Sequence, residues 1–502
     1  MNNNLKRNVQ TDRLKAAGNH WDILVAGGGA TGLGIALDAA LRGYSVALLE
    51  AGDFASGTSS RSTKLVHGGV RYLAKGDLGL VIEALHERGL LQKNAPELVR
   101  NQSFIIPAYR WWEGPFYAIG LTLYDLLAGR LSFGRSHFIG RKKVLESIPT
   151  LNPRGLKGGV LYHDGQFDDA LLAIRLAQAA AREGACVVNY IPVETLLKDK
   201  SGKVCGVTAR DLETNEEITI HAGCVINATG VFADKILQMD QPAAPATIRP
   251  SQGVHLVLDK SFLPGTQALM IPKTSDGRVL FAIPWRDHVV VGTTDTLVSA
   301  PSREPVALPE EISFILETAG RYLVKPPGKS DVLSVFAGQR PLTAPREGKV
   351  KTREISRRHK ILVSGSGLIT IIGGKWTTYR RMAKDCLDRA IRSGLLPPAA
   401  CTTASYQIFG MPAGEFPGDE LLLPGYPYTS GMVRNAVHQE MARTLEDVLS
   451  RRLRVLITDA RASLVLAEKV ASIMAEELGR DEKWKTEQLI DYKNLTMNYI
   501  IH

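Results

Sequence analysis

The chain has 502 residues, enough for two to four domains at about 150 residues each. Hydrophobic residues make up 44% of it and charged residues 22%, and the mean hydropathy is −0.04, a composition that excludes disordered, fibrous and integral membrane classes. The net charge of +10 and the pI of about 9.2 attract phosphorylated metabolites, acidic lipids and nucleic acids alike.

The first twenty residues are polar and mildly basic, and they predict an extension that lacks the apolar core of a secretory signal. Residues 21–26 then form an apolar run, 27–32 a glycine-rich turn, 33–41 a helical pattern and 45–50 a second apolar run. This order of strand, turn, helix and strand predicts a βαβ unit.

The turn contains Gly27, Gly29 and Gly32, spaced so that the backbone can approach a pyrophosphate at the N-terminus of the following helix. Glu50 ends the second strand, where its carboxylate can accept hydrogen bonds from an adenosine ribose without a 2′-phosphate. Both FAD and NAD fit this pattern.

Three further segments favour a flavin. Residues 56–64 follow the second strand with small hydroxyl side chains and backbone donors suited to a diphosphate and a ribityl chain. Residues 225–230 form a buried strand that ends in a tight glycine turn, and 373–379 join another strand to a helix whose N–H groups can stabilise an anion on a reduced flavin.

The remaining elements continue the alternation of strands and helices. Between about residues 250 and 345 short β-rich runs predict a second sheet domain, and residues 410–431 form a linker rich in glycine and proline. Apolar residues then recur every fourth position from Val433 to Leu449 and again from Leu464 to Leu478, which predicts helices, the last one ending at Gly479. The other predicted elements are a helix at 171–181, strands at 186–190, 206–212, 224–228, 279–283, 289–292, 361–363 and 368–372, and a helix at 378–391.

The cysteines and the hydropathy bear on the compartment. The five cysteines include no CxxC pair and no histidine at metal spacing, so no disulfide framework and no metal site are expected, and a reducing compartment fits best. No stretch reaches the roughly 18 apolar residues of a membrane span. Any contact with a membrane is therefore expected at its surface.

Six motifs give the chain a specific resemblance. It is similar to the FAD-dependent glycerol-3-phosphate dehydrogenases over about residues 20–480, and the block at 58–73 is the most specific of the shared motifs. The matching segments are Gly27–Gly32, Thr58–Leu73, Asn227–Gly230, Gly292–Asp295, Gly338–Leu342 and Gly373–Arg380. No EF-hand pair of the mitochondrial branch follows.

The resemblance implies an α/β (α+β) chain with the D-amino-acid-oxidase-like flavoprotein fold: a Rossmann-like FAD-binding domain, a β-rich substrate domain and a C-terminal helical domain. After the extension at 1–20, the oxidoreductase region is expected at 21–400, the linker at 410–431 and the helical domain at 432–502. Within that region the FAD-binding segments are expected at about 21–95, 155–245 and 355–400, and the substrate segments at about 96–154 and 246–354.

The family also implies residue roles. His255, on an apolar strand, is the expected catalytic base, and Arg340 is expected to act in both catalysis and substrate binding. The expected substrate-binding set is Arg71, Tyr72, Arg340, Arg357 and Lys375. The expected FAD-binding set is Gly27, Gly29, Gly32, Glu50, Thr58, Ser59, Ser60, Ser62, Lys64, His67, Gly68, Val193, Ala228, Gly230, Gly374, Lys375, Trp376, Thr377 and Thr378.

The implied reaction is oxidation of sn-glycerol 3-phosphate to dihydroxyacetone phosphate by hydride transfer to flavin N5, with electrons passed to a membrane quinone. The alternatives are a glycerol-3-phosphate oxidase that uses oxygen and another flavoenzyme of this fold that acts on an amine. Expected partners are the substrate, the quinone, an anionic lipid surface and a second copy of the chain in a homodimer; nucleic acid is not expected because no recognition motif accompanies the basic residues.

The segment 109–143 mixes aromatic residues, a short amphipathic helix and a basic stretch. This pattern fits a helix that attaches to an anionic membrane from one side, and equally a buried helix with an exposed basic loop. With the first interpretation the protein is placed at the cytoplasmic face of a bacterial inner membrane, as a peripheral protein, or else in the cytoplasm.

Overall fold

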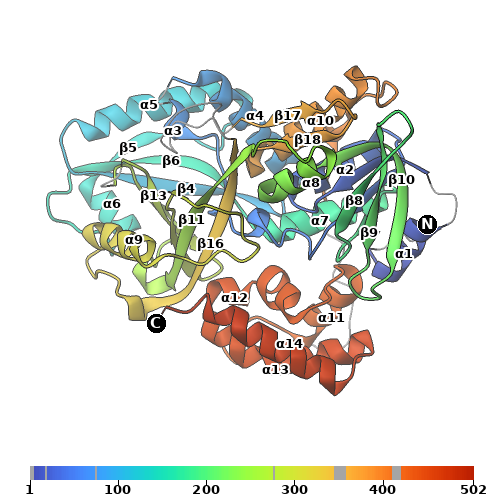
Figure 1. The fold of residues 1–502 in the computed structure, drawn as a ribbon. Helices are drawn as coiled ribbons and strands as arrows, with labels where there is room; N and C mark the ends of the chain where they lie inside the picture. Colours follow the sequence, from blue (N-terminus) through green and yellow to red (C-terminus); the bar gives the residue numbers. More distant parts are fainter. Residues whose placement is uncertain are drawn as a thin grey trace.

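The computed structural model describes residues 5–16, 20–73, 76–274, 277–343, 358–409 and 420–501, with only the backbone of residues 71 and 72. Two sheet-based bodies lie side by side, and the C-terminal helices run along both of them (Figure 1). This is the expected α/β class with a helical C-terminal domain.

The first sheet has the strand order β17-β18-β10-β1-β2-β7, with β9 and β8 added beside β10. Its centre is parallel, with Ile23 opposite both Val46 and Cys224 in neighbouring strands. Its strands are β1 (His20–Ala26), β2 (Val46–Leu49), β7 (Cys186–Val188), β8 (Val193–Lys198), β9 (Val204–Arg210), β10 (Glu217–Asn227), β17 (Lys360–Val363) and β18 (Ile369–Ile372).

One almost wholly buried helix organises this body. Helix α2 (Ala30–Leu41) packs against both α7 (Asp169–Arg182) and α10 (Tyr379–Arg392), and Leu33 and Ile35 are completely buried. The predicted βαβ unit is therefore present as β1-α2-β2. Helix α1 (Arg7–Lys15) contacts β7 and β10, and helix α8 (Ala233–Asp240) contacts β8 and β18.

The N-terminal extension is part of this body. Gln10 of α1 is fully buried, and its side-chain oxygen accepts a hydrogen bond from the backbone N–H of Val187 in β7. Arg7 pairs with Asp211 at 2.7 Å. The extension is thus docked on the first sheet by buried polar contacts, which its polar composition alone does not indicate.

The second sheet has the order β15-β11-β14-β13-β12-β4-β6-β3, with β16 beside β11 and β5 beside β6. Its longest ladder pairs β11 with β16 from Ile248 opposite Thr343 to Leu258 opposite Val332. Its strands are β3 (Leu65–Val66), β4 (Val99–Ala108), β5 (His137–Gly140), β6 (Gly158–Phe167), β11 (Ile248–Asp259), β12 (Ala268–Ile271), β13 (Leu280–Trp285), β14 (His288–Gly292), β15 (Thr296–Leu297) and β16 (Val332–Thr343).

Strands β3 and β6 belong to this sheet although both fall in segments that the sequence predicts to be FAD-binding. β6 pairs with β4 along its whole length, from Val99 opposite Phe167 to Ala108 opposite Gly158. After β2 the chain therefore returns to the first body only at α7. The helices and short 3-10 turns around the two sheets are α3 (Val70–Leu73), α4 (Leu78–Asn94), α5 (Glu113–Ala128), α6 (Arg141–Ser147), α9 (Pro309–Tyr322), η1 (Thr58–Ser60), η2 (Gly129–Leu131), η3 (Gly230–Phe232), η4 (Lys260–Phe262), η5 (Lys329–Asp331), η7 (Trp376–Thr378) and η8 (Thr403–Ser405).

The C-terminal domain contains α11 (Ser430–Gln439), the π-helical turn η9 (Asp447–Arg452), α12 (Val455–Thr458), α13 (Ala460–Leu478) and α14 (Glu482–Met497). The predicted helix from Val433 to Leu449 is interrupted, because α11 ends at Gln439 and Met441 has a φ of +58°. Met441, Leu445 and Leu449 are all buried, so the apolar spacing continues through irregular backbone.

Two boundaries of the C-terminal domain can be compared with the sequence. α13 ends as predicted at Gly479, which is in the left-handed conformation with a φ of +61°. Part of the predicted linker, 410–419, lies outside the described residues, and 420–429 form a turn closed by the pairing of Leu421 with Thr429. Of the helices that the structure describes, none combines the length and apolarity that crossing a membrane requires.

We predict that Gly32→Ala destabilises the first body. A Cβ atom at this position would lie 1.8 Å from the carbonyl oxygen of Gly27, so the turn between β1 and α2 must shift. Overpacking of this kind costs about 1–3 kcal/mol in the free energy of unfolding, measurable by urea denaturation. Gly365→Ala, where a Cβ meets nothing within 4 Å, is the matched control and should change stability by less than about 0.5 kcal/mol. Equal stability of the two variants would contradict this account of the turn.

Candidate functional site

A cavity of about 800 Å³ lies between the two bodies, at the carboxyl ends of the parallel strands. Its walls come from the β1-α2 turn, the loop after β2, the ends of β10 and β18, strands β11 and β16, and the C-terminal domain. This is the usual position for a ligand in an open α/β sheet.

The glycine turn brings backbone donors to one wall. Gly27 has a φ of +111°, and a Cβ atom there would lie 2.6 Å from the carbonyl oxygen of Ala228 at the end of β10. Gly29 is the N-cap of α2 and supplies no side chain. The N–H of Ala30 in the first turn donates to Ser59 Oγ, and Ala30 and Thr31 line the cavity, where the N-terminal end of the helix favours an anion. Gly32 does not line the cavity; it is the position where α2 packs closely on the turn.

Glu50 is held at the cavity by its own neighbours. Its two carboxylate oxygens accept hydrogen bonds from the backbone N–H groups of Gly28, at 2.6 Å, and Gly52, at 2.8 Å. Burial raises the pKa of Glu50, while these two N–H groups act in the opposite direction. The backbone carbonyl of Glu50 accepts a hydrogen bond from Ile191 N. Val193, which follows Ile191 closely, lines the same end of the cavity as Glu50. These groups suit an adenosine ribose.

The backbone turn in the polar block at 58–64 directs some of its side chains toward the cavity and others away from it. Thr58, Ser59 and Ser62 line the cavity, and Ser59 Oγ accepts from Ala30 N in the first turn of α2 at 3.0 Å. Ser60 and Lys64 do not line it. Lys64 is fully buried, and its ammonium donates to Asp169 Oδ2 at 2.7 Å.

Of four other residues in the predicted FAD-binding set, two line the cavity and two lie behind its wall. His67 and Thr377 line the cavity and are linked by a hydrogen bond from His67 N to Thr377 Oγ1. Gly68 packs against Leu85, whose side chain would lie 2.4 Å from an added Cβ, and Thr378 is buried behind the turn. Both are structural neighbours of the site. The remaining predicted residues that line the cavity are Ala228, Gly230, Gly374, Lys375 and Trp376.

His255 faces this cavity from β11 and is 2% exposed. Its Nε2 lies 2.9 Å from Thr63 Oγ1, and its ring stacks on Phe336 with 4.8 Å between centroids. Its Nδ1 is buried and has no hydrogen-bond partner within the described part of the chain. Burial, followed by the charges of Lys64 and Arg340, holds the pKa of His255 well below 6.5, so the imidazole is neutral at physiological pH.

Glycines make room for the two functional side chains. An added Cβ at Gly292, opposite His255, would lie 2.4 Å from the imidazole Cδ2. An added Cβ at Gly253 would lie 2.3 Å from Arg340 Nη2. Arg340 comes from β16, lines the cavity and donates to the backbone carbonyl of Thr294 at 3.3 Å. The β11-β14-β16 ladder therefore fixes His255 and Arg340 next to each other.

Three members of the predicted substrate set lie beyond what the structure describes. Arg71 and Tyr72 have a described backbone in α3 but no described side chain, and Arg357 lies outside the described residues. The structure brings the other two, Arg340 and Lys375, to the same cavity.

The cavity also has walls that the sequence did not identify. Arg303 and Glu304 reach it from the loop after β15, and Glu446, Arg451 and Leu495 reach it from the C-terminal domain. No motif marks these residues, because they lie far in sequence from the glycine turns that they face. An apolar end of the cavity was missed for the same reason, and it is lined by Leu65, Phe104, Tyr162, Met270, Val279 and Phe281.

These features fit FAD. The first turn of α2, where Ala30 and Thr31 line the cavity, suits its diphosphate, and Glu50 suits its ribose. His255, whose buried Nδ1 has no hydrogen-bond partner within the described residues, lines the same cavity. A model of the FAD dependent oxidoreductase family matches residues 22–380. A model of the C-terminal domain of alpha-glycerophosphate oxidase matches residues 405–485.

Related proteins agree over the whole chain. The mitochondrial glycerol-3-phosphate dehydrogenase of Saccharomyces cerevisiae is 36% identical over 589 residues, covering 96% of this chain and 90% of that protein. The human mitochondrial enzyme is 38% identical over 532 residues, covering 94% and 72%. Both relatives are named as glycerol-3-phosphate dehydrogenases.

Solved structures give the same result. The glycerol-3-phosphate dehydrogenase from Bacillus halodurans complexed with FAD is 30% identical and superposes with a TM-score of 0.78, covering 99% of this chain and 98% of that one. The L-alpha-glycerophosphate oxidase from Mycoplasma pneumoniae with FAD bound is 17% identical and has a TM-score of 0.60 over 78% of this chain and 100% of that one, which shows a shared fold. The chain therefore belongs to the FAD-dependent glycerol-3-phosphate dehydrogenase family, and FAD is its cofactor.

Proposed function

We propose that this protein oxidises sn-glycerol 3-phosphate to dihydroxyacetone phosphate and passes the electrons to a quinone in a membrane. The observation that carries the proposal is a buried neutral imidazole, His255, which shares one cavity with the cations Arg340 and Lys375. A phosphate monoester carries about −1.5 to −2 charges and needs more than one cationic partner. An amino acid substrate of a related flavoenzyme would need only one cation for its carboxylate.

The residues divide the chemistry between them. The residues of the cavity would hold FAD, which would supply the acceptor for the hydride that leaves the carbinol carbon of the substrate. His255 accepts the hydroxyl proton at Nε2, the nitrogen that Thr63 Oγ1 contacts at 2.9 Å. Arg340 orients the phosphate, and the negative charge of the phosphate offsets the cations that hold down the pKa of His255. Substrate binding thus increases the basicity of His255 while the substrate is in the cavity.

The apolar end of the cavity supports a lipid-soluble acceptor. Its walls include Phe104, Tyr162 and Phe281, and the cluster formed by these residues contains Leu121 of α5. α5 also carries exposed apolar side chains on its outer face, among them Phe116 at 62% and Ile119 at 73% exposed. A helix that packs against the protein on one face and carries apolar side chains on its exposed face suits attachment to one leaflet of a membrane.

An oxygen-dependent oxidase is the second candidate, favoured by the match of residues 405–485 to the C-terminal domain of alpha-glycerophosphate oxidase. The two candidates differ only in the electron acceptor. After anaerobic reduction by glycerol 3-phosphate, rapid reoxidation by a soluble quinone with slow reoxidation by oxygen supports the dehydrogenase, and the reverse order supports the oxidase. The predicted homodimer remains a prediction.

We predict that His255→Ala slows flavin reduction by about 10²–10⁴-fold, because a positioned base contributes roughly this factor. In the parent, the rate should fall on the acid side below pH 6.5, since protonation of the imidazole, whose pKa is lowered, removes the base. Stopped-flow reduction across pH measures both effects. His288→Ala, at a partly exposed position on β14 that does not line the cavity, is the control and should keep the rate and the acid limb; persistence of both in His255→Ala would assign the proton elsewhere.

We predict that Arg340→Met lowers kcat/KM for glycerol 3-phosphate by about ten- to a hundredfold, the value of one charged hydrogen bond of about 1.5–3 kcal/mol. Turnover of glycerol, which has no phosphate, should change little. Arg249→Met, an exposed residue of β11 that does not line the cavity, should leave both substrates unaffected. An equal proportional loss on both substrates would argue against recognition of the phosphate by Arg340.

We predict that the double variant Phe116→Ser and Ile119→Ser binds anionic liposomes about tenfold or more weakly, because two exposed apolar side chains are lost from the lipid-facing surface. Flotation should depend on anionic lipid and weaken in salt, since Arg130, Arg135 and Lys142 follow the helix. Val465→Ser with Ile490→Ser, equally exposed in the C-terminal domain, is the control. Unchanged flotation of the α5 variant would exclude α5 as the attachment site.

A further inference from the structure

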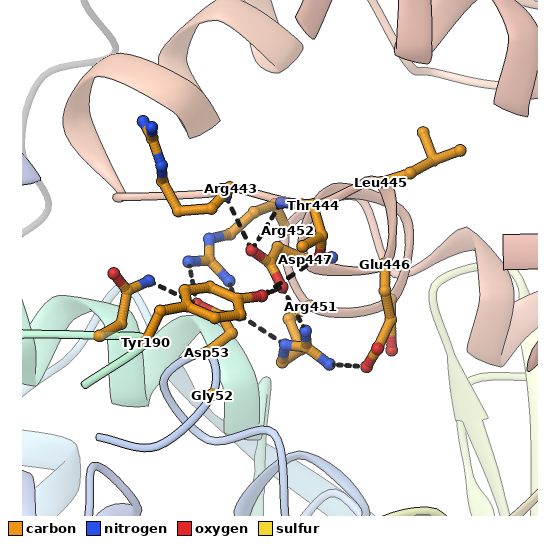
Figure 2. Close-up of polar contacts among 12 residues, drawn as sticks. Gly52, Asp53, Tyr190, Arg443, Thr444, Leu445, Glu446, Asp447, Arg451 and Arg452 are labelled. Carbon is orange, nitrogen blue, oxygen red and sulfur yellow. Dashed lines mark hydrogen bonds and ion pairs between the residues drawn. The ribbon is translucent and has the colours of Figure 1, made fainter. Parts of the chain in front are cut away.

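One ion cluster joins the loop after β2 to the C-terminal domain. Asp53 is completely buried, and its carboxylate accepts two hydrogen bonds from Arg452, at 2.6 and 2.9 Å, and one from Arg451 Nε. Both arginines belong to the turn η9, and Figure 2 shows their guanidinium groups converging on Asp53 from the C-terminal domain. A fork of two arginines fixes a carboxylate in both distance and orientation.

The loop that carries Asp53 is the loop that carries Glu50. Within it, Gly52 N donates to Glu50 Oε1, and Gly52 O accepts from Tyr190 N at 3.0 Å. Ala55 N donates to Gly28 O in the glycine turn. Residues 50–55 are therefore fastened between the dinucleotide turn on one side and the C-terminal domain on the other, so a shift of Asp53 must move Glu50.

The C-terminal domain also reaches the cavity itself. Arg451 and Glu446 line the cavity and form an ion pair, and Arg451 Nη2 donates to Asp447 at 2.6 Å. Asp447 in turn accepts from the hydroxyl of Tyr190, another cavity residue, at 2.7 Å (Figure 2). Burial alone would raise the pKa of Asp53, but Arg452 and Arg451 hold it below its ordinary value, so this carboxylate stays charged and paired.

We propose that the C-terminal domain retains FAD: Arg451 and Arg452 clamp the Asp53 loop, close the adenosine end of the cavity around Glu50, and must let go before the dinucleotide can leave. The proposal requires only that FAD binds and is independent of the substrate and electron acceptor. Because coupling between two sites is reciprocal, bound FAD must in turn stabilise the docking of residues 440–454.

The first test uses the unaltered chain. Apoprotein is prepared and its amide hydrogen exchange is compared with that of the same protein after addition of FAD, of ADP or of FMN. FAD and ADP should both slow exchange in residues 440–454 as well as in 50–56, and FMN, which lacks adenosine, should not protect 440–454. Unchanged exchange of 440–454 with FAD, or equal protection by FMN and ADP, overturns the proposal.

The second test measures the rate at which flavin fluorescence appears after dilution of the holoenzyme. Arg452→Met removes two of the bonds to Asp53 from a residue that does not line the cavity, and it should release FAD about ten- to a hundredfold faster. Arg452→Lys keeps the charge without the fork and should fall between this variant and the parent.

The matched control is Arg443→Met, which breaks the two-bond pair of Arg443 with Glu213 across the same interface but away from the cavity. It should release FAD at nearly the parental rate. If Arg452→Met releases FAD at the parental rate, the proposal is overturned. It is also overturned if Arg452→Met and Arg443→Met release FAD equally faster than the parent, because a general loosening of the interface would then explain the release. If Arg452→Met fails to fold, Arg452→Lys and the exchange experiment decide the question.

Discussion

The glycine turn after β1 lies so close to the end of β10 and to the first turn of α2 that neither Gly27 nor Gly32 has room for a methyl group. A Cβ at Gly27 would meet Ala228 O at 2.6 Å, and one at Gly32 would meet Gly27 O at 1.8 Å. This close approach fixes the N-terminal end of α2 at the cavity. The position of the dinucleotide-facing wall of the site depends on it.

The second sheet holds a neutral histidine among cations. His255 and Arg340 lie on neighbouring strands of one long antiparallel ladder, with Lys64 buried close behind them. Burial lowers the pKa of Lys64 to about 7, and Asp169 opposes that shift. Asp169 of α7 pairs with the Lys64 ammonium at 2.7 Å, and Asp295 lies 3.4 Å from Arg340 Nη1, so nearby carboxylates offset part of this positive charge.

Local sequence order predicted the elements whose signals are local: the β1-α2-β2 unit, the end of α13 at Gly479 and the β-rich middle of the chain. The sequence could not predict which side chains of the turn at 58–64 face the cavity. Ser59 and Ser60 are the same residue type, and only the path of the backbone through η1 makes one of them line the cavity and not the other. Local sequence order also missed Arg451, because 398 residues separate this side chain from Asp53 and only the folded chain brings them together. The break at Met441 was hidden for a related reason: buried irregular backbone keeps the same apolar spacing as a helix.

The wall formed by Glu446, Arg451 and Leu495 gives the site an order of assembly. A ribosome makes the glycine turn, the Glu50 loop and the polar block first, then both sheets, and reaches this wall only afterwards. Domains tend to fold as they emerge, so the nascent chain passes through a stage in which the dinucleotide groove exists but its adenosine end is open. Completion of the C-terminal helices then adds the last wall of the cavity.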